Sequence, residues 1–407
     1  MRRSTSSGGP LTGIRVVEVG NYLAAPFCAA QLADLGADVI KVENPDGGDM
    51  SRQAGPFLDG ESSGFVRLNR NKRSLGLDLK SERGKELFRK LAAQSDVVIE
   101  NLRPGTMTHL GLDYEPLSAI NPRLVYFSAS GWGQDGPYAQ RPGLDIMAQA
   151  MSGLMSITGE EGGNPVKVGV PITDLACALY GALAIASALY AREQTGRGQH
   201  IDVCLFEAGV ALSVWEAGKY FATGEIPRRN GSAHQTSAPY QALRSSDGYF
   251  TVGATSPKTW TAFCAVLKIE DLRDDPRFAL NRSRKENLDE LLPLLEAVTT
   301  AQPTDHWVTA LQAAGVPCER LQTYDQVYND PQLTGRQFFS DVPHAKLGPI
   351  RVMGSPMRFS ETKVAMRAAA PVLGEHTAEI LSDLGCQPSE VHDLINAGIV
   401  AAATVHA

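Results

Sequence analysis

The stretch Ile14-Arg15-Val16-Val17-Glu18-Val19 is a short run of mostly β-branched residues, which predicts a buried strand. The segment 25–35 follows with the apolar spacing of a helix, and Asp38-Val39-Ile40-Lys41-Val42-Glu43 predicts a second strand. Strand, helix and strand in close succession form a βαβ unit, in which the two strands lie parallel in one sheet. The opening of the chain therefore predicts an α/β fold.

The same alternation continues to residue 128 and extends the parallel sheet. The pattern predicts further strands over 74–79, 97–99 and 124–128 and further helices over 82–94 and 114–120. A second part begins near Tyr220. There the pattern predicts an antiparallel strand pair over 240–243 and 249–253 around a turn at 245–248, and then helices over 260–267, 288–299, 305–314 and 377–384.

The composition is that of a globular protein. The chain has 407 residues, 43% hydrophobic and 20% charged, which is enough for two domains with large cores. A net charge of −7 argues against a nucleic-acid partner, because such proteins normally carry a basic face. Six scattered cysteines without a C-x-x-C pair argue against a disulfide framework or a zinc site, so no metal is expected.

The sequence shows no secretory signal and no pure apolar span, which predicts a cytoplasmic protein with no membrane partner. The most apolar stretch, 175–190, is interrupted by Ser187 and rich in alanine and glycine, which predicts a buried, close-packed helix. Residues 1–9 lack the apolar core of a secretory signal and are expected to form a disordered tail. The cysteine usage fits a reducing compartment.

Asp145 is the most informative single residue. It follows a Gly- and Pro-rich loop and opens a run of small side chains, in the segment Arg141-Pro142-Gly143-Leu144-Asp145-Ile146-Met147-Ala148-Gln149-Ala150-Met151-Ser152-Gly153. An ionised aspartate can attack an activated acyl group, and small neighbours allow a bulky substrate to approach. The same position also suits an N-cap, whose side chain accepts hydrogen bonds from the first helical N–H groups. The pattern alone leaves both interpretations open.

Two other motifs carry less weight. Gly131-Trp132-Gly133-Gln134-Asp135-Gly136 matches the dinucleotide fingerprint, but Pro137 and Pro142 interrupt the helix that the fingerprint requires. A loop that leads to Asp145 is the better interpretation. The basic cluster Arg67, Arg70, Lys72 and Arg73 is either an anion site or a solvated face.

Five blocks in the same order resemble the family III, or CaiB/BaiF-type, CoA-transferases, and the resemblance spans nearly the whole chain. The blocks are 35–43, 69–74, 100–105, the Asp145 segment and 195–199. Within the family the chain looks most like the succinate–hydroxymethylglutarate branch, through Gly231-Ser232-Ala233-His234 and Pro239-Tyr240-Gln241-Ala242.

The resemblance implies a fold and an assembly. It implies a doubly wound, Rossmann-like α/β domain over 10–215 that binds CoA and is completed by 335–407, with a smaller α+β domain over 216–334. It also implies an interlocked homodimer.

The resemblance also implies an activity and a nucleophile. Asp145 is expected to attack the thioester of an acyl-CoA, form a mixed anhydride and then an aspartyl-CoA thioester, and pass CoA to an acceptor acid. No tightly bound cofactor is expected, because acyl activation is conserved from one bond to the next.

Site residues follow from the resemblance position by position. CoA contacts are expected from Leu23, Ala24, Asn44, Leu77, Lys80, Asn101, Leu102, Arg103, His109, Ser130 and Gly131, and substrate contacts from Gly231 and His234. The chain departs from the family at Asn44 and His109, where arginine is common. The stretch from Gly231 also lacks the glycine run of oxalate- and formate-using members, which weakens a formyl-CoA:oxalate assignment. The resemblance instead implies a dicarboxylic acyl pair, with a donor such as succinyl-CoA.

Two rival functions remain. The α-methylacyl-CoA racemases share the fold, but they usually carry a His-Asp pair, whereas Leu144 precedes Asp145 here, so that His109 or His200 would have to substitute. A non-catalytic acyl-CoA binding protein is the other alternative, because a fold does not fix a function.

Overall fold

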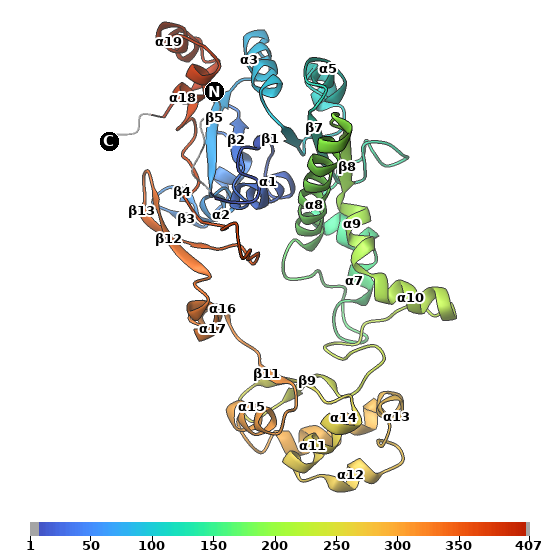
Figure 1. Cartoon of the computed structure of the whole chain (residues 1–407). Coiled ribbons are helices and arrows are strands. Elements are labelled where there is room, and N and C mark those ends of the chain that lie inside the picture. The colour runs from blue at the N-terminus through green and yellow to red at the C-terminus, as the bar shows by residue number, and fades with distance from the viewer. Residues whose placement is uncertain (1–7, 404–407) are drawn as a thin grey trace. The chain divides into compact units, whose positions relative to one another are not determined.

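The computed structural model describes residues 8–403, and these form two compact units (Figure 1). The first unit runs to residue 154 and adds 168–217 and 331–403, and the second comprises 155–167 and 218–330. Residues 155–167, which the sequence analysis assigned to the large domain, thus cluster with the second unit. Residues 1–7 of the expected tail lie outside the described residues, whereas Gly9 is buried and its carbonyl accepts a hydrogen bond from the Thr12 amide at 3.1 Å.

A seven-stranded sheet organises the first unit, and its strand order is β14-β5-β2-β1-β6-β7-β8. All neighbouring strands are parallel except β14, which runs antiparallel to β5 at one edge. The mixed α/β architecture with a mostly parallel sheet confirms the sequence prediction. The strands are β1 (Arg15–Val19), β2 (Asp38–Glu43), β5 (Lys72–Leu77), β6 (Val97–Glu100), β7 (Val125–Ser130), β8 (His200–Cys204) and β14 (Val400–Ala401).

Helices cover both faces of this sheet because its strands are apolar on both sides. Along β1, Val16 faces a core built with helices α1 and α8, whereas Val17 faces a second core built with α3, α5, α18 and α19. The helices of this unit are α1 (Ala24–Asp34), η1 (Met50–Gln53), α2 (Ser63–Leu68), α3 (Glu82–Ala93), α4 (Thr106–Leu110), α5 (Tyr114–Ile120), α6 (Asp145–Met151), α8 (Ile172–Thr195), α9 (Leu205–Leu212), α17 (Pro331–Gly335), α18 (Thr377–Asp383) and α19 (Pro388–Asn396). Helices α7 (Leu154–Ile157) and α10 (Val214–Thr223) cross from one unit to the other.

Two short strand pairs complete the first unit. The pair β3 (Phe57–Leu58) and β4 (Glu61–Ser62) precedes α2, and β12 (Phe339–His344) pairs with β13 (Gly348–Met353). Phe65 and Val66 of α2 pack against the β12–β13 hairpin in a small separate core. The sequence pattern did not predict this hairpin.

The basic cluster of the sequence is engaged by partners within the first unit. Arg70 pairs with Asp34, Lys72 with Glu18, and Arg73 with Asp38, whereas Arg67 donates to the carbonyl and hydroxyl of Ser63. Three of the four side chains therefore form ion pairs with carboxylates of the same unit. The cluster is therefore a structural element of the sheet rather than a solvated face.

Helix α8 is buried on one side only, which corrects the expectation of a buried helix over 175–190. Ala176, Cys177 and Ile185 pack into the first core, but Leu183 is 64% exposed and Tyr190 is 71% exposed. Among the described residues, α8 is the one helix whose length and composition would suffice to cross a bilayer. Core helices of globular proteins pass the same test, and α8 contributes one face to such a core.

The second unit is built on a three-stranded antiparallel sheet in the order β11-β10-β9. The predicted hairpin is confirmed as β9 (Tyr240–Arg244) paired with β10 (Tyr249–Gly253). Trp260, Phe263 and Leu291 help to form its core. The remaining elements are α11 (Pro257–Leu267), α12 (Glu270–Asp274), α13 (Asn281–Glu286), α14 (Leu288–Thr299), α15 (Thr304–Ala313), β11 (Cys318–Arg320) and α16 (Tyr324–Val327).

Candidate active site

A cavity of about 360 Å³ opens at the carboxyl ends of β1, β2, β5 and β6 in the first unit. The chain passes from β1 to β2 and β5 on one side of β1, and then to β6, β7 and β8 on the other. The strand order therefore reverses beside β1, and α/β proteins bind ligands at such a reversal. The cavity has the position of a ligand site.

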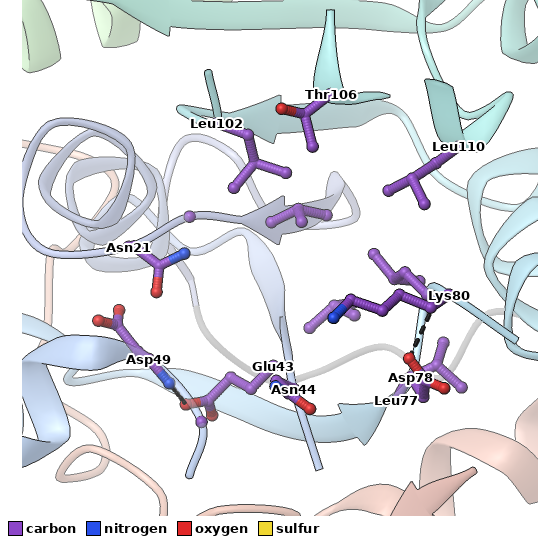
Figure 2. Close-up of a pocket in the computed structure, with 15 residues that line it drawn as sticks. Asn21, Glu43, Asn44, Asp49, Leu77, Asp78, Lys80, Leu102, Thr106 and Leu110 are labelled. Carbon is purple, nitrogen blue, oxygen red and sulfur yellow. Dashed lines mark hydrogen bonds between the residues drawn. The ribbon is translucent and has the colours of Figure 1, made fainter. Parts of the chain in front are cut away.

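The walls of this cavity differ in chemistry (Figure 2). Polar side chains of the loops after β1 and β2 lie on one side, and apolar side chains that follow β6 lie on the other. Lys80 stands beside them, and its backbone amide donates to Asp78 at 2.9 Å. The lining is Val19, Gly20, Asn21, Val42, Glu43, Asn44, Gly48, Asp49, Leu77, Asp78, Leu79, Lys80, Leu102, Thr106 and Leu110.

The structure brings four of the expected CoA contacts together in this cavity, namely Asn44, Leu77, Lys80 and Leu102. Four others lie close to it in the chain but outside its lining. Leu23 and Ala24 lie at the start of α1, Asn101 forms two hydrogen bonds with the backbone of Asn21, and His109 is an exposed residue of α4. Asn21 and Asp49, in the loops after β1 and β2, also line the cavity and were not predicted from the sequence.

Arg103, Ser130 and Gly131 lead from the cavity toward Asp145. The Arg103 guanidinium donates to the Gln140 carbonyl at 2.9 Å and so ties the segment after β6 to the loop that precedes Asp145. At the end of β7, the Ser130 hydroxyl accepts from the Gly133 amide at 2.9 Å. A Cβ on Gly131 would lie 2.8 Å from the Cα of Gly143, so both positions require glycine for the loop to close.

Asp145 is the first residue of α6, and its carboxylate caps a different helix. The amides of Met147 and Ala148 donate to the Leu144 carbonyl, so Asp145 forms no cap on its own helix. One carboxylate oxygen, Oδ1, accepts from the Thr173 amide at 2.9 Å and the Thr173 hydroxyl at 2.7 Å. The other, Oδ2, accepts from Gln149 Nε2 at 2.7 Å. Asp145 thus binds the first turn of α8, where the helix dipole favours a negative charge.

Asp174 is a second carboxylate at this place, and the sequence analysis missed it. It follows Thr173 in the first turn of α8, and among residues 8–403 its side chain has no hydrogen-bond partner. Burial, together with the charge of Asp145, raises the pKa of Asp174 to about 7. The available signal for Asp174 was an acidic residue at the start of a long apolar helix. The sequence did not indicate that it lies near Asp145, because α6, α7 and a loop separate the two residues in the chain.

Perturbed carboxyl groups of this kind concentrate at functional sites, because burial and a neighbouring like charge destabilise the ionised form. Once ionised, a carboxylate without hydrogen-bond donors is poorly solvated and reacts readily as a nucleophile. Asp145 and Asp174 together therefore form a candidate reaction centre. No group of side chains suited to a metal ion occurs within residues 8–403.

Gly231 and His234 lie in the second unit, in a loop that runs alongside β9. The Gly231 amide donates to Gly159 at 2.9 Å, and the His234 amide donates to the Tyr240 carbonyl at 2.9 Å. The His234 ring packs edge-on against Tyr240, with 5.1 Å between the ring centroids. Gly231 has a φ of 60°, in the left-handed region that favours glycine.

Comparison with known proteins gives one consistent family. The sequence model of CoA-transferase family III matches residues 11–377. A succinyl-CoA:glutarate CoA-transferase of Mus musculus is 37% identical over 393 residues, which cover 96% of this chain and 90% of that protein. An acetyl-CoA:oxalate CoA-transferase of Acetobacter aceti is 38% identical over 374 residues, which cover 91% of this chain and 95% of that protein.

A solved structure has the same fold. The crystal structure of a CaiB/BaiF family protein from Brucella suis superposes with a TM-score of 0.84 and is 41% identical. The superposition covers 92% of this chain and 99% of that one. The sequence and the fold therefore point to the same group of proteins.

Proposed function

Because this chain belongs to CoA-transferase family III, we propose that it moves CoA from a dicarboxylic acyl-CoA such as succinyl-CoA to a dicarboxylic acid acceptor. The observation that carries this proposal is the carboxylate pair Asp145 and Asp174, which lies in the same unit as the cavity at the strand reversal. The mouse relative is named for succinyl-CoA and glutarate, and the Acetobacter relative for acetyl-CoA and oxalate. The two named acceptors are both dicarboxylic acids.

The proposed reaction proceeds through two covalent intermediates and needs no oxidant or reductant. An aspartate oxygen attacks the thioester carbonyl, the C–S bond breaks, and CoA leaves as the thiolate with the bonding electrons. The thiolate then attacks the aspartyl carbonyl of the mixed anhydride, which releases the donor carboxylate and leaves an aspartyl-CoA thioester. The acceptor carboxylate reverses both steps. We expect the site to exclude water, because water would hydrolyse either intermediate.

Within the carboxylate pair, the geometry favours Asp174 as the attacking group. The resemblance implies Asp145, but three hydrogen bonds occupy its two oxygens. Asp174 has no such bonds among the described residues, and its raised pKa marks a poorly solvated carboxylate. In this proposal Asp145 is the charged neighbour that anchors α8 and raises the energy of ionised Asp174.

The expected ligand contacts divide between CoA and the acyl group. For CoA we propose Asn44, Leu77, Lys80 and Leu102 in the cavity, supported by Leu23, Ala24, Asn101, Arg103, His109, Ser130 and Gly131 around it. Lys80 is suited to a phosphate because it is an exposed lysine in the lining of the cavity. For the substrate acids we propose Gly231 and His234. Their amides are engaged within the loop, which leaves the His234 Nε2 as a polar group for a carboxylate.

Intact-protein mass spectrometry tests the proposed reaction. We expect incubation with succinyl-CoA to add the mass of CoA to the wild-type protein, and we expect hydroxylamine to remove the adduct. Glutarate, oxalate and other dicarboxylic acids should discharge the adduct with formation of the corresponding acyl-CoA, whereas monocarboxylic acids should do so slowly. CoA binding without any adduct would instead indicate a non-catalytic binding protein.

A racemase activity is not favoured, because the position before the aspartate carries no histidine. Leu144 precedes Asp145 and is 63% exposed, and residues 110–199 contain no histidine. Incubation of an α-methylacyl-CoA in deuterium oxide provides the test. Deuterium incorporation without CoA transfer would contradict the transferase proposal.

We further propose that the chain functions as an interlocked homodimer. The outer side of α8 exposes Leu183 and Tyr190, and Val210 and Leu212 of α9 are exposed as well. Exposed apolar residues on adjacent helices are typical of an interface. Light scattering should give twice the chain mass for the wild type, and Leu183→Glu should shift it toward the monomer. Leu179→Glu serves as a second variant, and a monomeric wild type would contradict the proposal.

A further inference from the structure

Lys41 lies within β2, its ammonium group is fully buried, and three acceptors surround it. It lies 2.7 Å from Glu18 Oε1, 2.8 Å from the Gly20 carbonyl oxygen and 2.8 Å from Asp49 Oδ2. Its side chain has an exposed fraction of 0%. The first two contacts are hydrogen bonds, and the third is an ion pair with the Asp49 carboxylate.

The acceptors of Lys41 belong to both loops that form the polar side of the cavity. Gly20 lies in the loop after β1, and Asp49 lies in the loop after β2. The other Asp49 oxygen, Oδ1, accepts from the Tyr22 amide at 3.1 Å and from the Ser51 amide at 2.8 Å. Lys41 and Asp49 therefore link the loop after β1 to the loop after β2.

The environment keeps Lys41 charged. Burial alone would lower the pKa of Lys41, but the charges of Glu18, Asp49 and Glu43 outweigh it and raise the pKa above its ordinary value. The tie between the loops therefore persists at every physiological pH. Separation of Lys41 from Asp49 would leave two buried charges without partners, which is energetically costly. The ion pair therefore holds the two loops at a fixed distance.

We propose that Lys41 is a positioning residue for acyl-CoA binding, because it fixes the spacing of the 20–22 and 44–53 loops. Lys41 itself does not line the cavity, whereas Gly20, Asn21, Asn44 and Asp49 do. Its loss should let the two loops separate and weaken CoA binding, with little effect on the carboxylate pair at the start of α8. The inference rests on the proposed function of the cavity.

Lys72 offers a matched control because it is buried to the same extent and shares Glu18. Its ammonium lies 2.7 Å from Glu18 Oε2, 2.8 Å from the Pro26 carbonyl and 2.7 Å from Asn69 Oδ1. None of these three acceptors lines the cavity. A methionine at either position removes one buried ammonium and keeps a side chain of similar length. Only the change at Lys41 removes the ammonium that bridges Gly20 and Asp49, although the Tyr22–Asp49 hydrogen bond between the loops remains.

Calorimetry with CoA and steady-state kinetics on Lys41→Met and Lys72→Met test the inference. Both variants should unfold at lower temperature than the wild type. Lys41→Met should raise the Kd of CoA and the KM of succinyl-CoA about tenfold or more, with kcat within about threefold of wild type. Lys72→Met should leave Kd and KM within about threefold. Equal KM effects in the two variants, or an unchanged KM in Lys41→Met, would overturn the inference.

Arginine variants replace the pair if the methionine variants fail to fold. Lys41→Arg and Lys72→Arg keep the charge, but a planar guanidinium cannot place its donors as the ammonium does. The same contrast in KM is expected. If the wild type itself binds no CoA, the proposed function fails; if it binds CoA and Lys41→Arg binds equally well, only the inference about Lys41 fails.

Discussion

Replacement of Asp174 by asparagine is expected to lower kcat by at least about 10³-fold and to abolish the covalent CoA adduct. An amide cannot form the mixed anhydride, so neither intermediate arises. Binding should survive, because Asp174 does not line the CoA cavity. Mass spectrometry after incubation with succinyl-CoA and calorimetry with CoA measure the two effects separately.

Asp145→Asn is the matched variant at the neighbouring carboxylate. An asparagine keeps an acceptor for Thr173 but replaces one oxygen with an amide that points toward Gln149 or Thr173. We expect a slower enzyme, with kcat reduced about 10- to 100-fold, that still accumulates the adduct. The reverse pattern, an adduct on Asp174→Asn and none on Asp145→Asn, would identify Asp145 as the nucleophile.

Thermal unfolding separates lost chemistry from lost structure. The native pKa of Asp174 is raised above its unfolded value, so the native state binds this proton more tightly than the unfolded chain does. The ionised carboxyl group therefore costs stability as the pH rises through about 7. Asp174→Asn removes that cost and should be at least as stable as wild type at pH 8. A large loss of stability would mean that the activity data do not report on chemistry.

The alternation of short apolar strands and helices predicted the sheet because each element is local in sequence. Val16 and Val17 face opposite cores, and such runs are the signature of strands buried on both faces. Strand β14 was missed because two residues, Val400 and Ala401, give no periodic signal. The exposed side of α8 was also missed, because Leu183 and Tyr190 are as apolar as core residues.

The candidate site was predictable only in part, because it depends on contacts between distant segments. Asp145, which follows a Gly- and Pro-rich loop, can be singled out from the sequence, and so can the loops at the ends of predicted strands. The capping of α8 by Asp145, which places Asp174 beside it, appears only once the chain is folded. The Lys41 tie likewise joins Gly20 to Asp49, and its lysine looks like an ordinary residue of a strand.

The rate of adduct formation at saturating succinyl-CoA should rise steeply with pH up to about 7 and then level off. Only ionised Asp174 attacks, and its pKa of about 7 sets the fraction in that form. The rate should therefore increase about 50-fold between pH 5 and pH 7 and by less than about threefold above pH 7. Stopped mixing followed by mass spectrometry measures this limb directly.

The pH at which the rate of adduct formation rises, here called the pH limb, also identifies the titrating group when Asp145 is changed. Glu100 also has a pKa of about 7, raised by burial, so a limb near neutrality does not by itself distinguish the two carboxyl groups. The Asp145 charge contributes to the pKa of Asp174, whereas Asp202 is the charge that raises the pKa of Glu100. Asp145→Asn should therefore move the limb to lower pH, by less than the full shift because burial remains the larger cause. A limb that stays at its wild-type pH in Asp145→Asn would show that Asp174 does not control the attack, and a rate that falls as the pH rises toward 7 would exclude any carboxylate nucleophile.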